Sequence, residues 1–392
     1  MKSKGFFFCI LCLALLICNA CEEPISSNPK EDKTELWPAA DASGERFGFI
    51  NKKGEMIIPA QYQMAYCFSG GVATVVTDDY RVLFINKKGK VVYTLPHGYN
   101  CDQYICNGGR RFYSYYGIYG MYDEHFNVII PELVANRELG PMSREGLILF
   151  RNLHEEGFYN RKGEVVLYNP FDSINGRPKE YSYADDSFHE GIEIVSSHNG
   201  LQGAINTHGE LVIDTTYIHL HYAGSGLFAY RLLLGGDYHF YGLMDVGGNI
   251  LTEPIYKDVY YEADGDNGLV PISDENSNVC YVDKTGAKVL RTSFIGYSYP
   301  FHEGVAWANI HDPSDNTIRY VLLDTEGNIL WKLKKDGRPL SSMHNGLCVI
   351  EEDSIVKYVD KSKNCVYSSK RPRYSPFAPL NPLLAPAKNE HN

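Results

Sequence analysis

The six letters FINKKG occur at residues 49–54 and again at residues 84–89. Around the first copy, RFG precedes the motif and EMIIP follows it, so two β-prone segments flank a short polar turn. The Asn51 side chain can bond the backbone two residues on, and Gly54 accepts the positive φ that a type I turn followed by a bulge requires. The stretch therefore predicts a β-hairpin, and its recurrence predicts a repeat protein.

The same pattern continues down the chain as two apolar residues, Asn or Asp, two variable residues and Gly. Successive turns are 35 to 46 residues apart. Seven copies keep both ends of the turn: Asn51 and Gly54, Asn86 and Gly89, Asn160 and Gly163, Asn206 and Gly209, Asp245 and Gly248, Asp283 and Gly286, and Asp324 and Gly327. Two more begin at Asp123 and Asp360 without the glycine, and in the first we expect Asn127 to take the left-handed place.

A second signature stands before most of these turns: a large apolar residue, two or three variable residues, Gly and an aliphatic residue. It begins at Phe68, Met142, Phe188, Phe301 and Met343. A β-prone run follows each glycine, so each unit holds at least three strands, and a fourth fits where two units join. One such unit cannot bury enough apolar surface alone, so neighbouring units must stack.

These observations predict an all-β fold, a tandem array of about eight to nine three-to-four-stranded repeat units. We expect a β-propeller-like arrangement, because four-stranded units of about 40 residues are typical of propeller blades. Nine turns exceed the usual four to eight blades, so the outer units are either incomplete caps or members of an open β-solenoid, which is the alternative fold.

The repeat core resembles that of the WG-repeat proteins over about residues 45–365. Gly48-Phe49-Ile50-Asn51 matches the family's Gly-aromatic-Ile-Asp core, and three similar segments begin at Gly157, Gly203 and Gly242. Phe47, Tyr119, Tyr241 and Tyr320 stand where the family has Trp, and no copy keeps that Trp. The resemblance implies a β-repeat architecture and no particular activity.

The first 20 residues are predicted to be a signal peptide, since Lys2 and Lys4 precede a stretch without charge from Gly5 to Ala20. An N-terminal anchor that stays in place is the alternative. Cys21 follows Ala20 and resembles the lipidated cysteine of a bacterial lipobox, although Cys18 and Asn19 depart from that pattern. The resemblance implies two acyl chains on Cys21, which would anchor the protein stably in a membrane.

The predicted organisation is a signal peptide at 1–20, a lipidated and flexible tether at 21–36, a WG-type β-repeat domain at 37–370 and a Pro-rich tail at 371–392. Glu22-Glu23 resembles surface-export signals of some Bacteroidota. We therefore expect a lipid-anchored protein of the Gram-negative cell envelope, at the outer membrane. The sequence is compatible with either the periplasmic or the surface side of that membrane.

The formal net charge is −11, and removal of Lys2 and Lys4 would lower it by 2, to −13. Such an acidic chain argues against nucleic acid as a partner. Six cysteines would remain beyond Cys21: Cys67, Cys101, Cys106, Cys280, Cys348 and Cys365. Their spacing forms neither a disulfide framework nor a pair of CxxC metal knuckles, so we expect small core residues.

Three motifs suggest chemistry, and in each a structural explanation is preferred. FHEG recurs at 188–191 and 301–304, at the same place in two units, which favours a repeat position over a catalytic His-Glu pair. His219 and His221 share one strand face, as zinc ligands could, but lack a clear third ligand and are expected on the surface. Asp264 to Gly268 with Glu275 has the spacing of a calcium loop, yet conflicts with the periodicity.

Acidic pairs that could serve a glycosidase are Asp78-Asp79, Asp185-Asp186 and Glu351-Glu352, the last followed by Asp353. The first and third fall in loops between strands, where solvated hairpin tips are expected. The sequence predicts no metal site and no cofactor, and we find no support for an enzyme.

Aromatic residues are the more informative feature, with 30 Tyr and 18 Phe. Tyr113 and Tyr115 share one face of a predicted strand, and Tyr116 takes the other. They either pack between units or form a stacking platform for sugars or a partner's side chains.

The preferred hypothesis is an exported, non-enzymatic lipoprotein that acts as a repeat scaffold and binds an unknown protein or a glycan through its loops. One alternative is a carbohydrate-active hydrolase on a propeller-like frame, with two carboxylates about 5–10 Å apart. The other is a purely structural envelope protein.

Overall fold

Hairpins joined by the recurring Asn or Asp turns account for nearly all of the regular structure. In a computed structural model of the chain, residues 35–372 are described except 103–106, 115–116, 118, 134–137, 153, 171–180, 185–186, 233–239, 261–264 and 313–315. These residues form 33 β-strands and belong to one compact unit that begins at Glu35. Within them, no helix is long and apolar enough to cross a bilayer.

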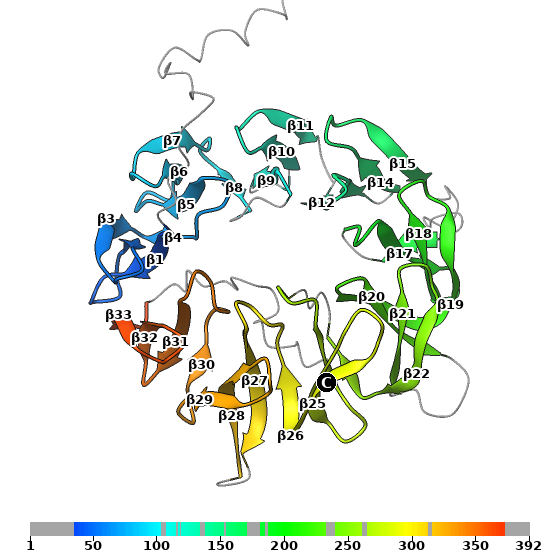
Figure 1. The fold of residues 1–392 in the computed structure, drawn as a ribbon. Coiled ribbons are helices and arrows are strands. Elements are labelled where there is room, and N and C mark those ends of the chain that lie inside the picture. Colours follow the sequence, from blue (N-terminus) through cyan, green and yellow to red (C-terminus); the bar gives the residue numbers. More distant parts are fainter. Residues whose placement is uncertain are drawn as a thin grey trace, which may run out of the picture. The chain divides into compact units, whose positions relative to one another are not determined.

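The described strands form seven antiparallel sheets, and two of these have seven strands and contain two repeat units each. Counted by repeat unit, they give nine blades, here called blades 1 to 9 (Figure 1). Blade 1 has β1 (Trp37–Ala40), β2 (Phe47–Ile50) and β3 (Met56–Tyr62). Blade 2 has β4 (Met64–Ala65), β5 (Val72–Val76), β6 (Val82–Asn86) and β7 (Val91–Thr94). Blade 3 has β8 (Tyr99–Cys101), β9 (Gly109–Ser114), β10 (Tyr119–Asp123) and β11 (Val128–Leu133). Blade 4 has β12 (Glu138–Met142), β13 (Ile148–Arg151), β14 (Glu155–Tyr159) and β15 (Val165–Pro170).

Blades 5 and 6 share one long strand. Blade 5 has β16 (Tyr181–Tyr183), β17 (Ile192–Ser197), β18 (Gln202–Asn206) and the first half of β19 (Leu211–Gly224). Blade 6 has the second half of β19, with β20 (Leu227–Leu232), β21 (Tyr241–Asp245) and β22 (Ile250–Tyr256).

Blades 7 and 8 repeat this arrangement. Blade 7 has β23 (Asp258–Val259), β24 (Val270–Ser273), β25 (Asn278–Val282) and the first part of β26 (Lys288–Ser298). Blade 8 has the rest of β26, with β27 (Val305–Asp312), β28 (Thr317–Asp324) and β29 (Ile329–Lys332). Blade 9 has β30 (Arg338–Pro339), β31 (Cys348–Glu352), β32 (Ile355–Val359) and β33 (Cys365–Lys370).

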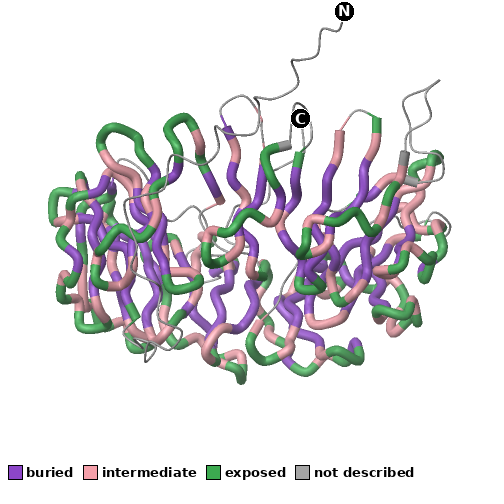
Figure 2. Tube along the Cα trace, turned by 90° about the horizontal axis from the view of Figure 1, so that it is seen from above, coloured by how far each residue is buried: buried purple, intermediate pink, exposed green. Residues whose placement is uncertain are grey.

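Within a blade, burial follows the order of the strands. In blade 2, β5, β6 and β7 follow one another outward from the centre of the ring in Figure 1. The middle strands are buried on both faces, as in β2, where all four residues are buried, whereas the outermost strands alternate or are exposed, as in β7. Figure 2, which views the ring from its edge, shows buried residues mostly at mid-height and exposed residues mostly where the chain turns.

Each pair of neighbouring blades encloses its own apolar core, and the described residues contain nine such clusters, one for each junction. The decisive junction joins blade 9 to blade 1, where Trp37 and Ile50 pack with Val349 and Tyr358. The Tyr367 hydroxyl also donates a hydrogen bond to the Ala40 carbonyl oxygen, at 2.5 Å. The ring therefore closes, so the propeller-like prediction is confirmed and the open solenoid is wrong.

All nine Asn or Asp turns have one geometry. In the first, Asn51 Oδ1 accepts hydrogen bonds from the backbone nitrogens of Lys53 (2.9 Å) and Glu55 (3.0 Å), and Gly54 has φ of 81°. The other eight carboxamides and carboxylates also accept from the backbone two and four residues on.

Asn127 does not take the left-handed position of its turn, so that expectation is wrong. The left-handed position falls three residues after the Asp, so Phe126 (φ 64°) takes it in the third blade and Lys363 (φ 65°) in the ninth. The ring of Phe126 stacks on Tyr93, with centroids 4.4 Å apart and planes 11° apart. This packing between blades 2 and 3 offsets the backbone strain that a non-glycine residue meets there.

A further regularity links the first and fifth positions of these turns. In three of the four turns that open with Asn, the amide donates to a Glu at the fifth position, as Asn51 does to Glu55 (2.6 Å); Asn160 and Asn206 do the same. Where the turn opens with Asp, as at Asp245, an Asn at the fifth position donates to the carboxylate, here Asn249 (2.9 Å). Seven of the nine turns thus pair an amide with a carboxylate.

The turn glycines also touch the preceding blade. A Cβ added to Gly163 would lie 2.6 Å from the Ile129 carbonyl oxygen of blade 3, and one on Gly54 would overlap the Val366 carbonyl oxygen of blade 9. Glycine is therefore required at these positions for two reasons: it adopts a positive φ without strain, and it has no side chain to collide with the preceding blade.

We predict that Gly54→Ala destabilises the protein more than Gly200→Ala. Both glycines have φ of 81°, so both substitutions incur strain of about 1–2 kcal/mol. Only Gly54 lies against a neighbouring backbone, whereas no atom lies within 4 Å of the Cβ position at Gly200. Urea unfolding of the two variants gives the comparison, and equal losses would show that the contact with blade 9 contributes nothing.

Candidate functional site

A cavity of about 600 Å³ lies where blades 2 and 3 meet, and we call it the tyrosine cleft. Five of the described residues that line it are tyrosines: Tyr66, Tyr80, Tyr99, Tyr113 and Tyr119. The other described lining residues are apolar or neutral and polar, among them Asn100, and none carries a charge at neutral pH. Its volume lies within the range of about 300–1,000 Å³ that is typical of ligand pockets.

The register of blade 3 explains how one wall of the cleft forms. Asn100, Tyr113 and Tyr119 stand directly opposite one another across β8, β9 and β10. Cross-strand partners lie close enough for their side chains to interact, and the rings of Tyr113 and Tyr119 have centroids 5.9 Å apart. The structure thus places Tyr113 at a cavity, while Tyr115 and Tyr116 lie outside the described residues.

The sequence did not single out the other four tyrosines of the cleft as binding residues, and the most informative of these is Tyr80. It occupies the turn Thr77–Arg81, has φ of 59° and is 73% exposed. Its amide donates to the Thr77 carbonyl oxygen (3.0 Å), which closes the turn. The same position in four other blades, defined by the same backbone hydrogen bond, is held by Gly44, Gly117, Gly200 and Ser277. The equivalent turns have Gly or Ser at this position of positive φ, so a tyrosine there departs from the repeat pattern and marks Tyr80 as a candidate functional residue.

Three phenols of the cleft have a raised pKa. Burial raises the pKa of Tyr66 and of Tyr113, and a hydrogen bond with Glu132 raises the pKa of Tyr99. Burial also raises the pKa of the Cys101 thiol to about 12. The cleft therefore offers neutral hydrogen-bonding groups and aromatic rings, and its thiol is not a thiolate nucleophile at neutral pH.

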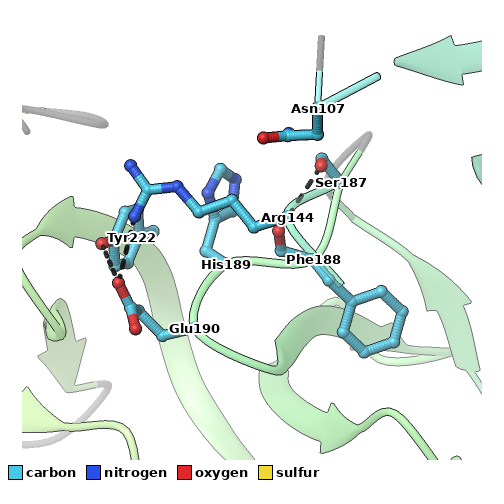
Figure 3. Close-up of a pocket in the computed structure, with 7 residues that line it drawn as sticks. All are labelled: Asn107, Arg144, Ser187, Phe188, His189, Glu190 and Tyr222. Carbon is cyan, nitrogen blue, oxygen red and sulfur yellow. Dashed lines mark hydrogen bonds and ion pairs between the residues drawn. The ribbon is translucent and has the colours of Figure 1, made fainter. Parts of the chain in front are cut away.

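A second, smaller cavity of about 190 Å³ surrounds the first FHEG motif (Figure 3). The ring of His189 stacks on Tyr222, with centroids 4.6 Å apart and planes 13° apart. Glu190 accepts from Arg144 (3.4 Å) and from the Tyr222 hydroxyl (3.5 Å). Figure 3 shows this group, which joins side chains of blades 4, 5 and 6.

The two FHEG motifs occupy the same place, as expected. Each forms a tight turn with positive φ at two successive residues, Glu190 and Gly191 in one and Glu303 and Gly304 in the other. An acid of the preceding blade binds each turn: Glu145 accepts from the Gly191 amide (2.7 Å), and Asp266 accepts from the Glu303 amide (2.5 Å). These turns therefore connect neighbouring blades.

The two histidines of β19 share a face, as predicted, with ring centroids 5.2 Å apart. The expectation that both lie on the surface is wrong for His221, which is 3% exposed and has Nε2 3.0 Å from the Val259 carbonyl oxygen. Burial, with the neighbouring His219, lowers the pKa of His221 to about 3. Among the residues that the structure describes, no group of three His, Cys, Asp or Glu side chains is placed to hold a metal ion.

One acidic cluster differs from expectation. Glu351 and Glu352 are not solvated tips, because they end β31 and are 7% and 3% exposed. Arg338 binds Glu351 at 2.8 Å, and two lysines, Lys357 and Lys363, bind Glu352 at 3.0 and 3.1 Å. Burial opposes ionisation of Glu352, but the hydrogen bonds from these lysines and from the backbone outweigh it, so its pKa is lowered.

The other acids stay apart in the described part of the chain. Asp78 and Asp79 are exposed and pair with Arg46 and Arg81. Of the proposed calcium loop, Asp266 contacts His302 and Glu275 contacts Lys288. Asp185, Asp186 and Asp264 lie outside the described residues.

The five cysteines in the described ranges have free thiols: Cys67, Cys101, Cys280, Cys348 and Cys365. Three of them are buried, as expected of core residues, whereas Cys365 is exposed. Cys106 lies outside the described residues.

We predict that lowering the pH from 7 to 4 destabilises the native state in part through His221. Its folded pKa lies below the unfolded value of about 6.5, so in this range the unfolded chain binds a proton that the folded chain does not. The free energy of unfolding should therefore decrease as the pH is lowered from 7 to 4. The decrease should be smaller in His221→Gln. The exposed His208→Gln is the control, and a slope unchanged in His221→Gln would contradict the assignment.

Comparison with known proteins agrees with this architecture. Residues 47–80 match the WG containing repeat family. No curated protein sequence matches the chain. A crystal structure of the eukaryotic initiation factor aligns with 89% of this chain and 100% of its own, at 10% identity and a TM-score of 0.56. Dipeptidyl peptidase 4 of Porphyromonas gingivalis aligns over 76% of this chain and 58% of its own, at 11% identity and a TM-score of 0.52.

At such identities the likeness concerns the fold alone. The chain is a propeller-like β-repeat protein that carries a WG containing repeat at residues 47–80.

Proposed function

We propose that this chain is a non-enzymatic, lipid-anchored scaffold of the cell envelope that binds a protein or a glycan through its ring of blades. The observation that carries the proposal is the tyrosine cleft, a cavity between two blades whose described lining has five tyrosines and no charged residue. Tyrosine offers a large apolar surface and a hydroxyl with little conformational entropy to lose, so it is common in binding surfaces.

The contacts of the acids favour binding over hydrolysis. A glycosidase needs two carboxyl groups about 5–10 Å apart at one pocket. Among described residues, the tyrosine cleft has no carboxylate, and the cavity at the FHEG motif has Glu190 alone. A third cavity of about 180 Å³ has Glu138, together with Arg111 and Arg151. The buried Glu351 and Glu352 serve ion pairs within blade 9, so the hydrolase alternative has little support.

The envelope location rests on the N-terminal sequence. Lys2 and Lys4, the uncharged stretch from Gly5 to Ala20 and the adjoining Cys21 favour export and lipidation. These residues lie outside the described part of the structure.

Mass spectrometry of the purified chain should detect a mature protein that begins at Cys21 and carries a diacylglycerol. Cys21→Ser should retain the signal peptide or lose its acyl mass, whereas Cys18→Ser should be processed normally. An unmodified Cys21 in the wild-type chain would contradict lipid anchoring and leave the binding role to be judged separately.

The binding role predicts that the full chain, purified from envelopes in mild detergent, retains a protein or a glycan after washing. An equal amount of heat-denatured chain is the control. Incubation with envelope polysaccharides should release no new reducing ends. Retention of nothing above the control would contradict the scaffold role, and release of reducing ends would favour the hydrolase.

A further inference from the structure

Tyr80 is held in a backbone conformation that its side chain disfavours. A left-handed residue with a Cβ costs roughly 1–2 kcal/mol relative to glycine, and four equivalent turns use Gly or Ser instead. The Tyr80 side chain is 73% exposed, so burial does not repay this strain. Strained residues that packing does not explain are concentrated at functional sites, and Tyr80 lines the tyrosine cleft.

From this we propose that the tyrosine cleft is a binding site for an uncharged carbohydrate chain, with Tyr80 as an exposed stacking surface at the cleft. The assignment rests on the proposed binding function and narrows it to one ligand class.

The chemistry of the lining selects a neutral ligand. The described residues that line the cleft carry no charge, and the charged groups next to them already have partners there: the Arg110 guanidinium donates to the Thr74 hydroxyl (2.8 Å), and Glu132 bonds Tyr99. A further anionic or cationic group would therefore find no exposed counter-ion on the described lining. A chain with a formal charge of −11 also repels anions at long range. Zwitterionic and acidic ligands are therefore disfavoured.

The same lining suits a sugar. A pyranose ring has an apolar face of C–H groups and a rim of hydroxyls, and both need a partner when water is removed. The rings of Tyr113 and Tyr119 offer apolar surface, and Asn100, opposite Tyr113 in the register, adds an amide that can donate and accept. Thr74 and Ser114 add hydroxyl groups at the same cavity.

The shape of the cleft favours a chain over a single sugar. Lining residues come from three strands of blade 2 and three strands of blade 3, and the volume of about 600 Å³ is that of a pocket for a drug-sized molecule. Tyr80 stands on a turn beyond the strand β5, where it can extend the stacking surface.

The experiment uses the full chain in detergent and isothermal titration calorimetry. The probes are neutral hexasaccharides of glucose, mannose and xylose, a hexamer of galacturonate as the charged counterpart, and an uncharged tyrosine- and proline-rich peptide as the competing class. We expect at least one neutral hexasaccharide to bind with a Kd below about 1 mM, and the galacturonate hexamer and the peptide to bind at least about tenfold more weakly.

The decisive variant is Tyr80→Gly, which removes the ring and relieves the backbone. It should weaken hexasaccharide binding at least about tenfold, while the melting temperature stays the same or rises. Ser277→Gly is the matched control, since Ser277 holds the same turn position in blade 7 with φ of 64°. Ser277→Gly should relieve similar strain and lose the hydrogen bond from Lys257 Nζ to the Ser277 hydroxyl (2.8 Å), without changing the affinity for the hexasaccharide.

Several results would overturn the proposal. One is the failure of every neutral hexasaccharide to bind. Another is that the galacturonate hexamer or the peptide binds more tightly than the neutral hexasaccharides. The third is a lower melting temperature of Tyr80→Gly, which would show that Tyr80 has a structural role. If the hexasaccharides fail while the chain still retains an envelope partner, the scaffold function stands and only the carbohydrate assignment is lost.

Discussion

The contact on which the ring depends is the one between an Asn or Asp turn and the outermost strand of the blade before it. Each turn is closed by its own side chain, and each turn glycine lies against the neighbouring blade, as Gly163 lies against the Ile129 backbone and Gly89 against the Ile58 side chain. Local turn chemistry and packing between blades therefore act at the same residue. The apolar clusters then fill each junction, where each fully buried aliphatic or aromatic side chain contributes about 1.5–3 kcal/mol.

Much of the fold could be predicted because its signal is local. A turn such as Asn51 to Gly54 encodes its own geometry, and nine copies fix the number of blades. The repeat pattern carries no information on contacts between residues that are far apart in the sequence. Closure depends on contacts between residues about 320 positions apart, such as the Tyr358 hydroxyl and the Pro38 carbonyl oxygen. The burial of Glu351 and Glu352 depends on lysines and arginines that strand pairing brings to them, and no periodicity reveals those partners.

The candidate site was predicted only in part, for a related reason. The tyrosine-rich stretch directed attention to blade 3, and Tyr113 does line a cavity. Tyr80 belongs to a different blade and to a loop that looked like any other polar tip. Tyr80 stands out because the same backbone hydrogen bond places glycine or serine at the equivalent position of four other blades. Repeats thus supply an internal comparison: a position that departs from its own copies is a better indicator of function than a position that follows them.

The way the ring is joined has one further consequence. Blades 5 and 6 share β19 and blades 7 and 8 share β26, so covalent chain and continuous hydrogen bonding reinforce those junctions. In the described residues, blade 1 has three strands and blade 9 has four of its own, so neither lends a strand to the other. Side-chain packing around Trp37 and Tyr358 and a few hydrogen bonds hold that seam. Local opening of the ring, by force or by heat, should therefore begin at the junction of blades 9 and 1. The junctions that share a strand should open last.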